Sequence, residues 1–322
     1  MTTGSSRRAF LQSAAAAGAA ALSLSALLSA WAPRRAVARS SAHSAEPLGG
    51  KVLSDNVVQI TGLGTNAVLV TGADGALLVD CGPADRSAEL LRFVSKYPGA
   101  GRVQLLYNTH WHYDHTGGNE RLAKAGAQIS AHENTKLWLG ADFFSDWEGR
   151  RYTPRPKEAW PTRTFYTSGE TTFGKDQVVY GYLPRAHTDG DVYIFLPRQN
   201  VLVAGDLVSV GSYPILDYTT GGWIGGMADA SKALLEVVNE RTLIVPGSGP
   251  VQSRADLQAQ AEMLATMNER LKGLMRKGIG TDDLVAQPPT REFDAKWGDP
   301  KLFLVNAYRG LWGHVRELGG IV

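Results

Sequence analysis

Histidines crowd one short stretch of this 322-residue chain, the segment NTHWHYDHTGGN at residues 108–119. The apolar run before it, residues 103–107, is typical of a buried strand, and a tight turn after a strand brings such side chains together. Neutral imidazoles buried together without a cation leave lone pairs unsatisfied or force like charges close, which costs several kcal/mol. A divalent cation reverses the sign of that cost. The spacing therefore predicts a metal site, and the candidate ligands are His110, His112, Asp114 and His115.

The alternative interpretation of the stretch is an exposed polar loop, or core histidines satisfied by hydrogen bonds. It gives no reason for the paired glycines, Gly117 and Gly118, after a strand. Cys81 is the single cysteine, which excludes an intramolecular disulfide and a cysteine-rich metal cluster, so histidines and carboxylates must hold any ion. We expect Cys81 to be a small buried filler rather than a nucleophile, because no base is patterned beside it.

Composition narrows the class of protein. Hydrophobic residues make up 43% of the chain and charged residues 20%, a globular balance with enough apolar material for a substantial core. The formal net charge is +2, and part of that excess lies near the N-terminus, so no basic stripe indicates nucleic acid. We expect a small-molecule substrate as the partner, and the sequence makes no prediction of the oligomeric state.

Residues 1–38 are predicted to be an export signal. Arg7 and Arg8 precede a charge-free, alanine-rich run over residues 13–32, and small residues at positions 36–38 suit a peptidase. The pattern is typical of a twin-arginine signal peptide, cleaved after residue 38. The alternative is an uncleaved membrane anchor, but alanine and serine give weak insertion energy. We therefore expect a periplasmic or secreted mature protein with no stable membrane span.

The rest of the chain is predicted to be a linker, a main domain and a helical extension. Residues 39–50 are small and polar, as in a linker. Strands outnumber helices in both halves of residues 51–280, which suggests two sheets packed face to face with helices outside. Residues 281–322 are expected to form a C-terminal helical extension packed on that domain. The expected strands are residues 56–62, 66–72, 75–82, 103–110, 177–183, 191–197, 200–208 and 241–247, and the expected helices are residues 84–97, 227–240, 251–275 and 302–318.

An excursion without a clean period separates the two halves, at residues 134–165. Long loops in compact domains are usually lids or binding loops. Its aromatic side chains, with those of the loop at residues 212–226, predict a pocket wall for an apolar or ring-bearing substrate. The alternative is that they pack these loops onto the body of the domain. The residues concerned are Trp138, Phe143, Phe144, Trp147, Trp160, Tyr213, Tyr218 and Trp223, and Trp111 of the histidine motif is a further candidate for substrate contact.

The stretch THWHYDHTGGN resembles the H-x-H-x-D-H motif of the metallo-β-lactamase superfamily. The resemblance extends to LLVDCGP before the motif and to AHTDGDVYIFLP and VLVAGD after it, and it covers nearly the whole expected mature domain. It implies a four-layer αββα sandwich, with one or two metal ions, usually zinc, at the edge between the sheets. It also implies a hydrolase.

The same resemblance assigns roles to single residues. His110, His112 and His187 match the ligands of a first metal ion, while Asp114 and His115 match ligands of a second. Asp206 matches the carboxylate that bridges the two ions. Asp80 resembles a carboxylate that orients the ligating imidazoles from behind.

One position departs from the family pattern. PGSGP at residues 246–250 resembles the family's P-G-H-G-P, but Ser248 stands in place of the histidine that completes the second metal site. A serine hydroxyl is a poor zinc ligand beside imidazole. We therefore expect weaker or variable occupancy of the second site, with water or Ser248 in the vacant position.

Other singled-out residues have structural interpretations. His132 matches a position that ends a strand without touching metal, although recruitment as a replacement ligand is an alternative. His43 of the linker and His314 of the last helix are not expected to be ligands. Arg185 either points away from the metal or holds an anionic group of the substrate, and strand alternation favours the metal side.

Together these residues predict a zinc-dependent hydrolase. Zinc held by three imidazoles lowers the pKa of its water from about 15.7 to about 7. The resulting metal-bound hydroxide would attack the carbonyl carbon of an ester, lactone, thioester or β-lactam, with Asp114 as the catalytic group that orients the water or passes on its proton. One alternative is an iron dioxygenase acting on a sulfur substrate, with a facial triad of His110, His187 and Asp206. Another is a non-enzymatic binding protein with a decayed second metal site.

Overall fold

The structure is a computed structural model, and it describes residues 46–73 and 75–319 of the chain. The predicted export signal and the linker up to residue 45 lie outside the described residues. Strand β1 begins at Gly49, just before the expected start of the fold at Lys51. Among the described residues, no helix combines the length and the apolar character that crossing a membrane requires.

Within the described residues, the strands form a seven-stranded sheet, a five-stranded sheet and a two-stranded hairpin. The first sheet comprises, in spatial order, β1 (Gly49–Ser54), β2 (Val57–Thr61), β3 (Ala67–Thr71), β4 (Ala76–Val79), β5 (Val103–Tyr107), β6 (Gln128–His132) and β9 (Arg163–Phe165). The second comprises β10 (Gly169–Phe173), β11 (Asp176–Tyr182), β12 (Val192–Leu196), β13 (Val201–Gly205) and β14 (Leu243–Pro246). The hairpin pairs β7 (Phe143–Ser145) with β8 (Arg150–Tyr152).

Strand β4 shows how the layers arise. Leu78 packs with Leu90 of helix α1 (Ser87–Val94) in a core beneath the helices. Leu77 and Val79 instead join a core shared with Ile194 of the second sheet. Successive side chains of a strand point to opposite faces, so a strand that is apolar at every position is buried on both faces.

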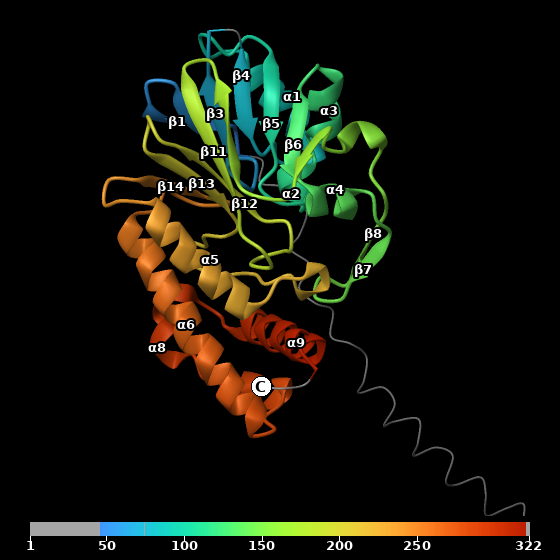
Figure 1. Cartoon of the computed structure of the whole chain (residues 1–322), viewed down its shortest axis with the longest axis vertical. Coiled ribbons are helices and arrows are strands. Elements are labelled where there is room, and N and C mark those ends of the chain that lie inside the picture. Colours follow the sequence, from blue (N-terminus) through green and yellow to red (C-terminus); the bar gives the residue numbers. More distant parts are fainter. Residues whose placement is uncertain (1–45, 74, 320–322) are drawn as a thin grey trace, which may run out of the picture. The chain divides into compact units, whose positions relative to one another are not determined.

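Helices cover the outer face of each sheet (Figure 1). Helices α1 and α3 (Asn119–Lys124) lie on the first sheet, α5 (Ile224–Val237) and α6 (Arg254–Arg276) lie on the second, and α9 (Lys301–Glu317) packs against α5. A third core fills the space between the second sheet and its helices. Helix, sheet, sheet and helix layers with cores between them confirm the predicted αββα sandwich. The remaining helices are α2 (Tyr113–Thr116), α4 (Glu133–Leu139), α7 (Thr281–Ala286), α8 (Arg291–Trp297) and the 3₁₀ turns η2 (Ala84–Arg86), η3 (Lys157–Ala159) and η4 (Tyr218–Thr220).

The helices after residue 280 share the core of the main domain. Phe303 and Leu304 of α9 are buried in the same cluster as Leu234 of α5 and Leu264 of α6. The C-terminal segment thus packs onto the helices that cover the second sheet (Figure 1).

Several loops that follow strands meet at one edge, between the two sheets. The histidine motif follows β5, which runs parallel to β4, and Asp206 directly follows β13, which runs parallel to β14. The backbone nitrogen of Val192, at the start of β12, donates to the carbonyl oxygen of Thr109 at 2.8 Å. This bond ties the second sheet to the motif of the first, where α/β proteins commonly place their sites.

The excursion at residues 134–165 contains short elements that the sequence did not reveal. It holds α4, the β7–β8 hairpin, η3 and strand β9, which pairs with β6 in the first sheet. Strands of three residues are too short to show a period of two. The edge strands β1 and β10 and strand β6 also lie outside the predicted set.

Candidate metal centre

The motif after β5 supplies the first side chains of the centre. His110 and His112 lie in the loop, and Asp114 and His115 lie in helix α2. Gly117 follows that helix, and a Cβ there would lie 2.4 Å from the backbone nitrogen of Ala84. The glycine is therefore needed for the close packing of this turn against the loop after β4.

Four side chains form a compact cluster: His110, His112, His187 and Asp206. One ligand atom of each lies within 4.8 Å of the others. His187 comes from the loop between β11 and β12, and Asp206 follows β13. The three imidazoles are at most 8% exposed. Segments far apart in the sequence therefore meet at one buried point.

Hydrogen bonds fix the protonated nitrogen of His110 and His115. The Thr109 hydroxyl donates to Asp80 Oδ2 at 2.7 Å and therefore accepts from His110 Nδ1 at 3.0 Å. His115 Nδ1 donates to the same Asp80 oxygen at 2.8 Å. In the neutral form of both rings Nε2 then carries the lone pair, and among the described residues neither buried Nε2 makes a hydrogen bond. Burial lowers the pKa of His115, but Asp80 and Asp206 outweigh burial and raise it well above its ordinary value.

Asp80 is held in place by an uncommon backbone conformation. Its φ angle is 57°, in the left-handed region that few residues other than glycine adopt. Its Oδ1 also accepts from the backbone nitrogen of Thr109 at 2.8 Å. The contacts of Asp80 are those of a carboxylate that orients ligands from behind.

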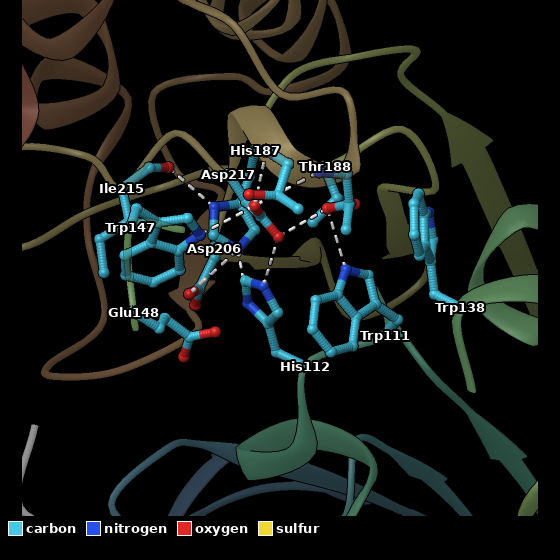
Figure 2. Close-up of polar contacts among 12 residues, drawn as sticks. Trp111, His112, Trp138, Trp147, Glu148, His187, Thr188, Asp206, Ile215 and Asp217 are labelled. Atoms are coloured by element: carbon cyan, nitrogen blue, oxygen red, sulfur yellow. Dashed lines mark hydrogen bonds and ion pairs between the residues drawn. The ribbon is translucent and has the colours of Figure 1, made fainter. Parts of the chain in front are cut away.

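The other two imidazoles are fixed in the same manner (Figure 2). His112 Nε2 donates to Asp217 Oδ2 at 3.1 Å, and His187 Nδ1 donates to the carbonyl oxygen of Ile215 at 2.8 Å. When both rings are neutral, the lone pairs therefore lie on His112 Nδ1 and His187 Nε2, which are 3.0 Å apart. Two lone pairs aimed at each other repel, and a cation bound by both removes that repulsion.

The donor set fits a tetrahedral zinc ion. Zinc takes imidazole nitrogens and carboxylate oxygens at about 2.0–2.2 Å, which places neighbouring ligand atoms roughly 3.3 Å apart. The separation is 3.0 Å between the His112 and His187 nitrogens and 3.5 Å between His187 Nε2 and Asp206 Oδ2. Burial lowers the pKa of His110 well below its ordinary value and that of His187 to about 4. Both rings are therefore neutral at pH 7, as ligation requires.

Each carboxylate oxygen of Asp206 lies near a different histidine. Its Oδ2 lies 3.5 Å from His187 Nε2 and its Oδ1 lies 3.3 Å from His115 Nε2. Burial raises the pKa of Asp206, but the neighbouring histidines outweigh burial and lower it well below its ordinary value. Gly247 allows the carboxylate to approach, since a Cβ there would lie 1.8 Å from Oδ1. Such a carboxylate has the arrangement of a bridge between two ion positions.

Asp114 and Ser248 lie outside the four-residue cluster. The Asp114 carboxylate is half-buried and makes no hydrogen bond or ion pair with any residue in the described part of the chain. Ser248 is exposed, and its hydroxyl likewise contacts no polar partner there. The His115 imidazole and the Asp206 carboxylate are therefore the candidate ligands that lie together at the second ion position.

Arg185 points toward α9 rather than toward the cluster. Its guanidinium donates to Glu317 Oε2 at 2.7 Å and to the carbonyl oxygen of Gly221 at 3.4 Å. It lines a pocket of about 450 Å³ together with Trp138 and Asp189. The expectation from strand alternation is wrong here, because Arg185 has a left-handed backbone with a φ angle of 56° in the loop after β11.

Two of the tryptophans proposed for substrate contact, Trp111 and Trp223, have packing roles. Trp111 is 0% exposed, and its indole nitrogen donates to Thr220 Oγ1 at 3.0 Å, so the prediction that Trp111 touches a substrate is wrong. Trp223 stacks on His314 of α9, with ring centroids 3.8 Å apart. These two aromatic side chains follow the alternative, in which the rings hold loops and helices together.

Two further residues have the structural roles that the sequence indicated. His132 ends β6, its Nδ1 accepts from the backbone nitrogen of Asn134 at 3.2 Å, and its ring stacks on Tyr182. Cys81 is fully buried, and burial raises the pKa of its thiol above the ordinary value. His43 lies outside the described residues.

Sequence reasoning missed Asp217 and Thr109. Asp217 caps η4 by accepting from the backbone nitrogens of Thr219 and Thr220. Aspartate is a preferred residue at such a cap, so the turn could have been predicted. Its contact with His112 joins positions 105 residues apart, and no local pattern marks it.

Comparison with known sequences finds a protein family whose model matches this chain. A family model described as the metallo-beta-lactamase superfamily matches residues 60–248. This region is more than half of the chain, and it includes every residue of the cluster from His110 to Asp206.

Similar proteins include several hydrolases. A type 2 metallo-beta-lactamase from Bacillus cereus is 25% identical over 201 residues, which are 62% of this chain and 73% of the relative. The acyl-coenzyme A thioesterase MBLAC2 of Homo sapiens is 24% identical over 205 residues, 56% of this chain and 72% of the relative. Among solved structures, the sec-alkylsulfatase Pisa1 from Pseudomonas sp. has a TM-score of 0.64 at 18% identity and covers 85% of this chain and 51% of its own. The structural likeness shows a shared fold.

Proposed function

The chain belongs to the metallo-β-lactamase superfamily and is a metallo-hydrolase of that type; on this premise, we propose that it is a zinc-dependent hydrolase. The cluster of His110, His112 and His187 carries the proposal, because each outer nitrogen donates to a fixed acceptor and each inner nitrogen faces the cluster. The proposed substrate is an ester, lactone, thioester or β-lactam. Two of the relatives, a beta-lactamase and a thioesterase, have names that denote hydrolysis at a carbonyl carbon and so support this class.

Each residue of the centre has a distinct part in the proposed reaction. A bound zinc ion supplies a water with a pKa of about 7 and polarises the carbonyl oxygen. His110 and His187 would hold it through Nε2, and His112 through Nδ1. Asp114, whose carboxylate no described residue engages, orients the attacking water and accepts its proton.

The second ion position is proposed to bind metal more weakly than the first. His115 Nε2 and one oxygen of Asp206 face it, and Asp114 is within the same short helix as His115. Ser248 brings no imidazole, and a hydroxyl is a poor zinc ligand. A second ion would stabilise negative charge on the leaving group.

Three inward-facing imidazoles favour zinc over the iron alternative. An iron dioxygenase of this kind uses two imidazoles and one carboxylate with open positions. Here His112 Nδ1 lies 3.0 Å from His187 Nε2, so a third imidazole faces the same point. A binding protein with a decayed centre would not need each ring held by an outer acceptor.

We also propose that the protein is exported by the twin-arginine route and cleaved after Ala38. The paired Arg7 and Arg8 before an uncharged run support this. In the native host, changing both arginines to lysine is expected to retain the protein in the cytoplasm. N-terminal sequencing of the exported protein is expected to begin at Arg39, and an unprocessed N-terminus would contradict cleavage.

A substrate panel tests the proposed activity. Purified protein is assayed against β-lactams, lactones and thioesters, then again after chelation and after zinc is restored. We expect hydrolysis of at least one class that is lost on chelation and regained with zinc. Turnover that survives complete removal of metal would contradict the proposal.

A further inference from the structure

Asp217 receives an unusual number of hydrogen bonds for a residue outside the cluster. It is 0% exposed. Its Oδ1 accepts from Trp147 Nε1 at 2.8 Å and its Oδ2 accepts from His112 Nε2 at 3.1 Å. The Thr220 hydroxyl also donates to Oδ2, at 2.6 Å. One carboxylate therefore joins a candidate metal ligand to a tryptophan from the excursion (Figure 2).

Trp147 lies in the turn of the β7–β8 hairpin, which belongs to neither large sheet. The base of the hairpin is held by aromatic packing, with Phe143 stacked on Tyr152 at 5.2 Å and Tyr152 against Trp111 at 4.9 Å between ring centroids. At the turn, the Trp147 ring lies 6.3 Å from the His112 ring. The hydrogen bond from Trp147 to Asp217 thus attaches the turn of the hairpin to the loop that holds Asp217, beside the candidate ligand His112.

We propose that Asp217 is a positioning residue for the metal centre and that Trp147 latches the β7–β8 hairpin onto it. Asp217 keeps the proton of His112 on Nε2, so that Nδ1 faces the cluster. The indole of Trp147 holds the opposite carboxylate oxygen and so limits rotation of the carboxylate. The position of the hairpin then affects how firmly His112 is held, and so affects metal affinity. Carboxylates behind ligating imidazoles commonly have such an effect on metal affinity.

This inference rests on the proposed metal centre, but its test does not require a known substrate. Zinc affinity is measured on the purified protein by competition with a fluorescent chelator. Cobalt replaces zinc in a second experiment, because its visible absorption reports the geometry of the ligands.

The matched variants are Trp147→Phe and Trp138→Phe. Both tryptophans are half-buried, and each donates its indole nitrogen to an aspartate at 2.8 Å, but the acceptor of Trp138 is Asp189. We expect Trp147→Phe to lower zinc affinity by up to about 10-fold and to shift the cobalt spectrum, with Trp138→Phe unchanged. Equal zinc affinity and equal cobalt spectra for the two variants would overturn the latch.

Asp217→Asn tests the positioning role itself. An amide can still accept from His112 through its oxygen but cannot accept on both sides, so we expect zinc affinity to fall by about 10–100-fold. Asp217→Glu, which keeps the charge, is expected to recover part of the loss. If Asp217→Asn does not fold, the Trp147→Phe comparison decides.

The tautomer of His112 gives a measurement that needs no metal. Because burial of His112 is outweighed by its bond to Asp217, which raises the pKa of the ring, long-range ¹H–¹⁵N spectra of the metal-free protein are recorded at a pH high enough for the ring to be neutral. The single proton of His112 is then expected on Nε2, and a neutral ring with its proton on Nδ1 would overturn the inference. A protein that binds zinc and shows these effects, yet hydrolyses nothing in the panel, would contradict the proposed function and leave the positioning role standing.

Discussion

At the scale of single residues, the centre depends on groups that touch no ion themselves. The Thr109 hydroxyl, the Asp217 carboxylate and the Ile215 carbonyl each hold the outer nitrogen of one imidazole. Because a neutral imidazole has one donor and one acceptor nitrogen, each of these bonds directs a lone pair inward. The chemistry of His110, His112 and His187 is thereby set by residues behind them.

Removal of one inward-facing imidazole should therefore end activity. His112→Ala deletes a ligand that is 8% exposed, and we expect loss of detectable metal-dependent hydrolysis together with weaker zinc binding. Zinc titration and the substrate panel check both effects. His314→Ala is the control, since that imidazole stacks on Trp223 outside the cluster, and equal activity of the two variants would contradict the assignment.

Because residue 248 is a serine, we expect the two ion positions to differ in zinc affinity. In the natural protein, calorimetric titration is expected to show one tight zinc site and a second, weaker one. Ser248→His supplies an imidazole next to Gly247, which packs against Asp206, and should tighten the second site, while Ser248→Ala should change little. Two equally tight sites in the natural protein would contradict the expectation that Ser248 weakens the second site.

The sequence predicted residues of the centre where they are neighbours along the chain or match a family motif. His110, His112, Asp114 and His115 lie within six positions after a predicted strand, and this density indicates a metal site. Asp217 was missed because its contact with His112 depends on two loops of different sheets. Arg185 was misplaced because alternation assumes an extended backbone, and its backbone is left-handed.

At the scale of elements, helix α4 begins on a titratable cap. His132 is its N-cap and accepts from the backbone nitrogen of Asn134 through Nδ1, which requires the neutral ring. Burial lowers the pKa of His132 below its ordinary value of 6.5, although a bond with the backbone of Tyr166 works the other way. Protonation therefore favours the unfolded chain, which binds the proton more readily.

A pH dependence follows from this cap. The contribution of neutral His132 to stability should be complete above about pH 6.5 and should decline as the pH falls below that value. His132→Asn keeps a good capping side chain without the titration. We expect the free energy of unfolding of metal-free protein to fall more between pH 7 and pH 5 in the natural chain than in the variant. Parallel pH profiles would contradict this.

Sequence patterns predicted most of the longer elements, although the strands β1, β6 and β10, of five or six residues, were missed. The strand at residues 201–205 lies within a predicted segment. The helix at residues 254–276 ends one residue beyond the predicted helix at residues 251–275. The three-residue strands β7, β8 and β9 were missed, because three positions do not distinguish a strand from a loop. The sequence therefore identified the excursion at residues 134–165 but not the short helices and strands within it.

At the scale of the described domain, the helices outside the second sheet share one hydrophobic core. Leu304 of α9 is 0% exposed and lies in the same core as α5 and α6, whereas Leu302, two positions earlier, is 45% exposed. We expect Leu304→Ala to lower the free energy of unfolding by about 2–5 kcal/mol and Leu302→Ala by less than about 0.5 kcal/mol. Denaturant unfolding of both variants measures the difference. Equal stabilities would show that α9 is only loosely attached.

The two-sheet arrangement is what brings the centre together. The motif at residues 108–119 follows a strand of the first sheet, and Asp206 follows a strand of the second. The sequence indicated two packed sheets from the excess of strands, while the family resemblance supplied the pairing of His187 and Asp206 with the motif. Spacing along the chain alone does not determine which loops of two sheets meet.

Elemental analysis of the purified protein, made without added metal and after anaerobic purification, tests the metal centre most directly. The cluster of His110, His112, His187 and Asp206 predicts at least about one zinc ion per chain, and a double variant of His110 and His187 to alanine should hold none. Stoichiometric iron in place of zinc, or the same metal content in the double variant, would contradict a zinc centre built from these side chains.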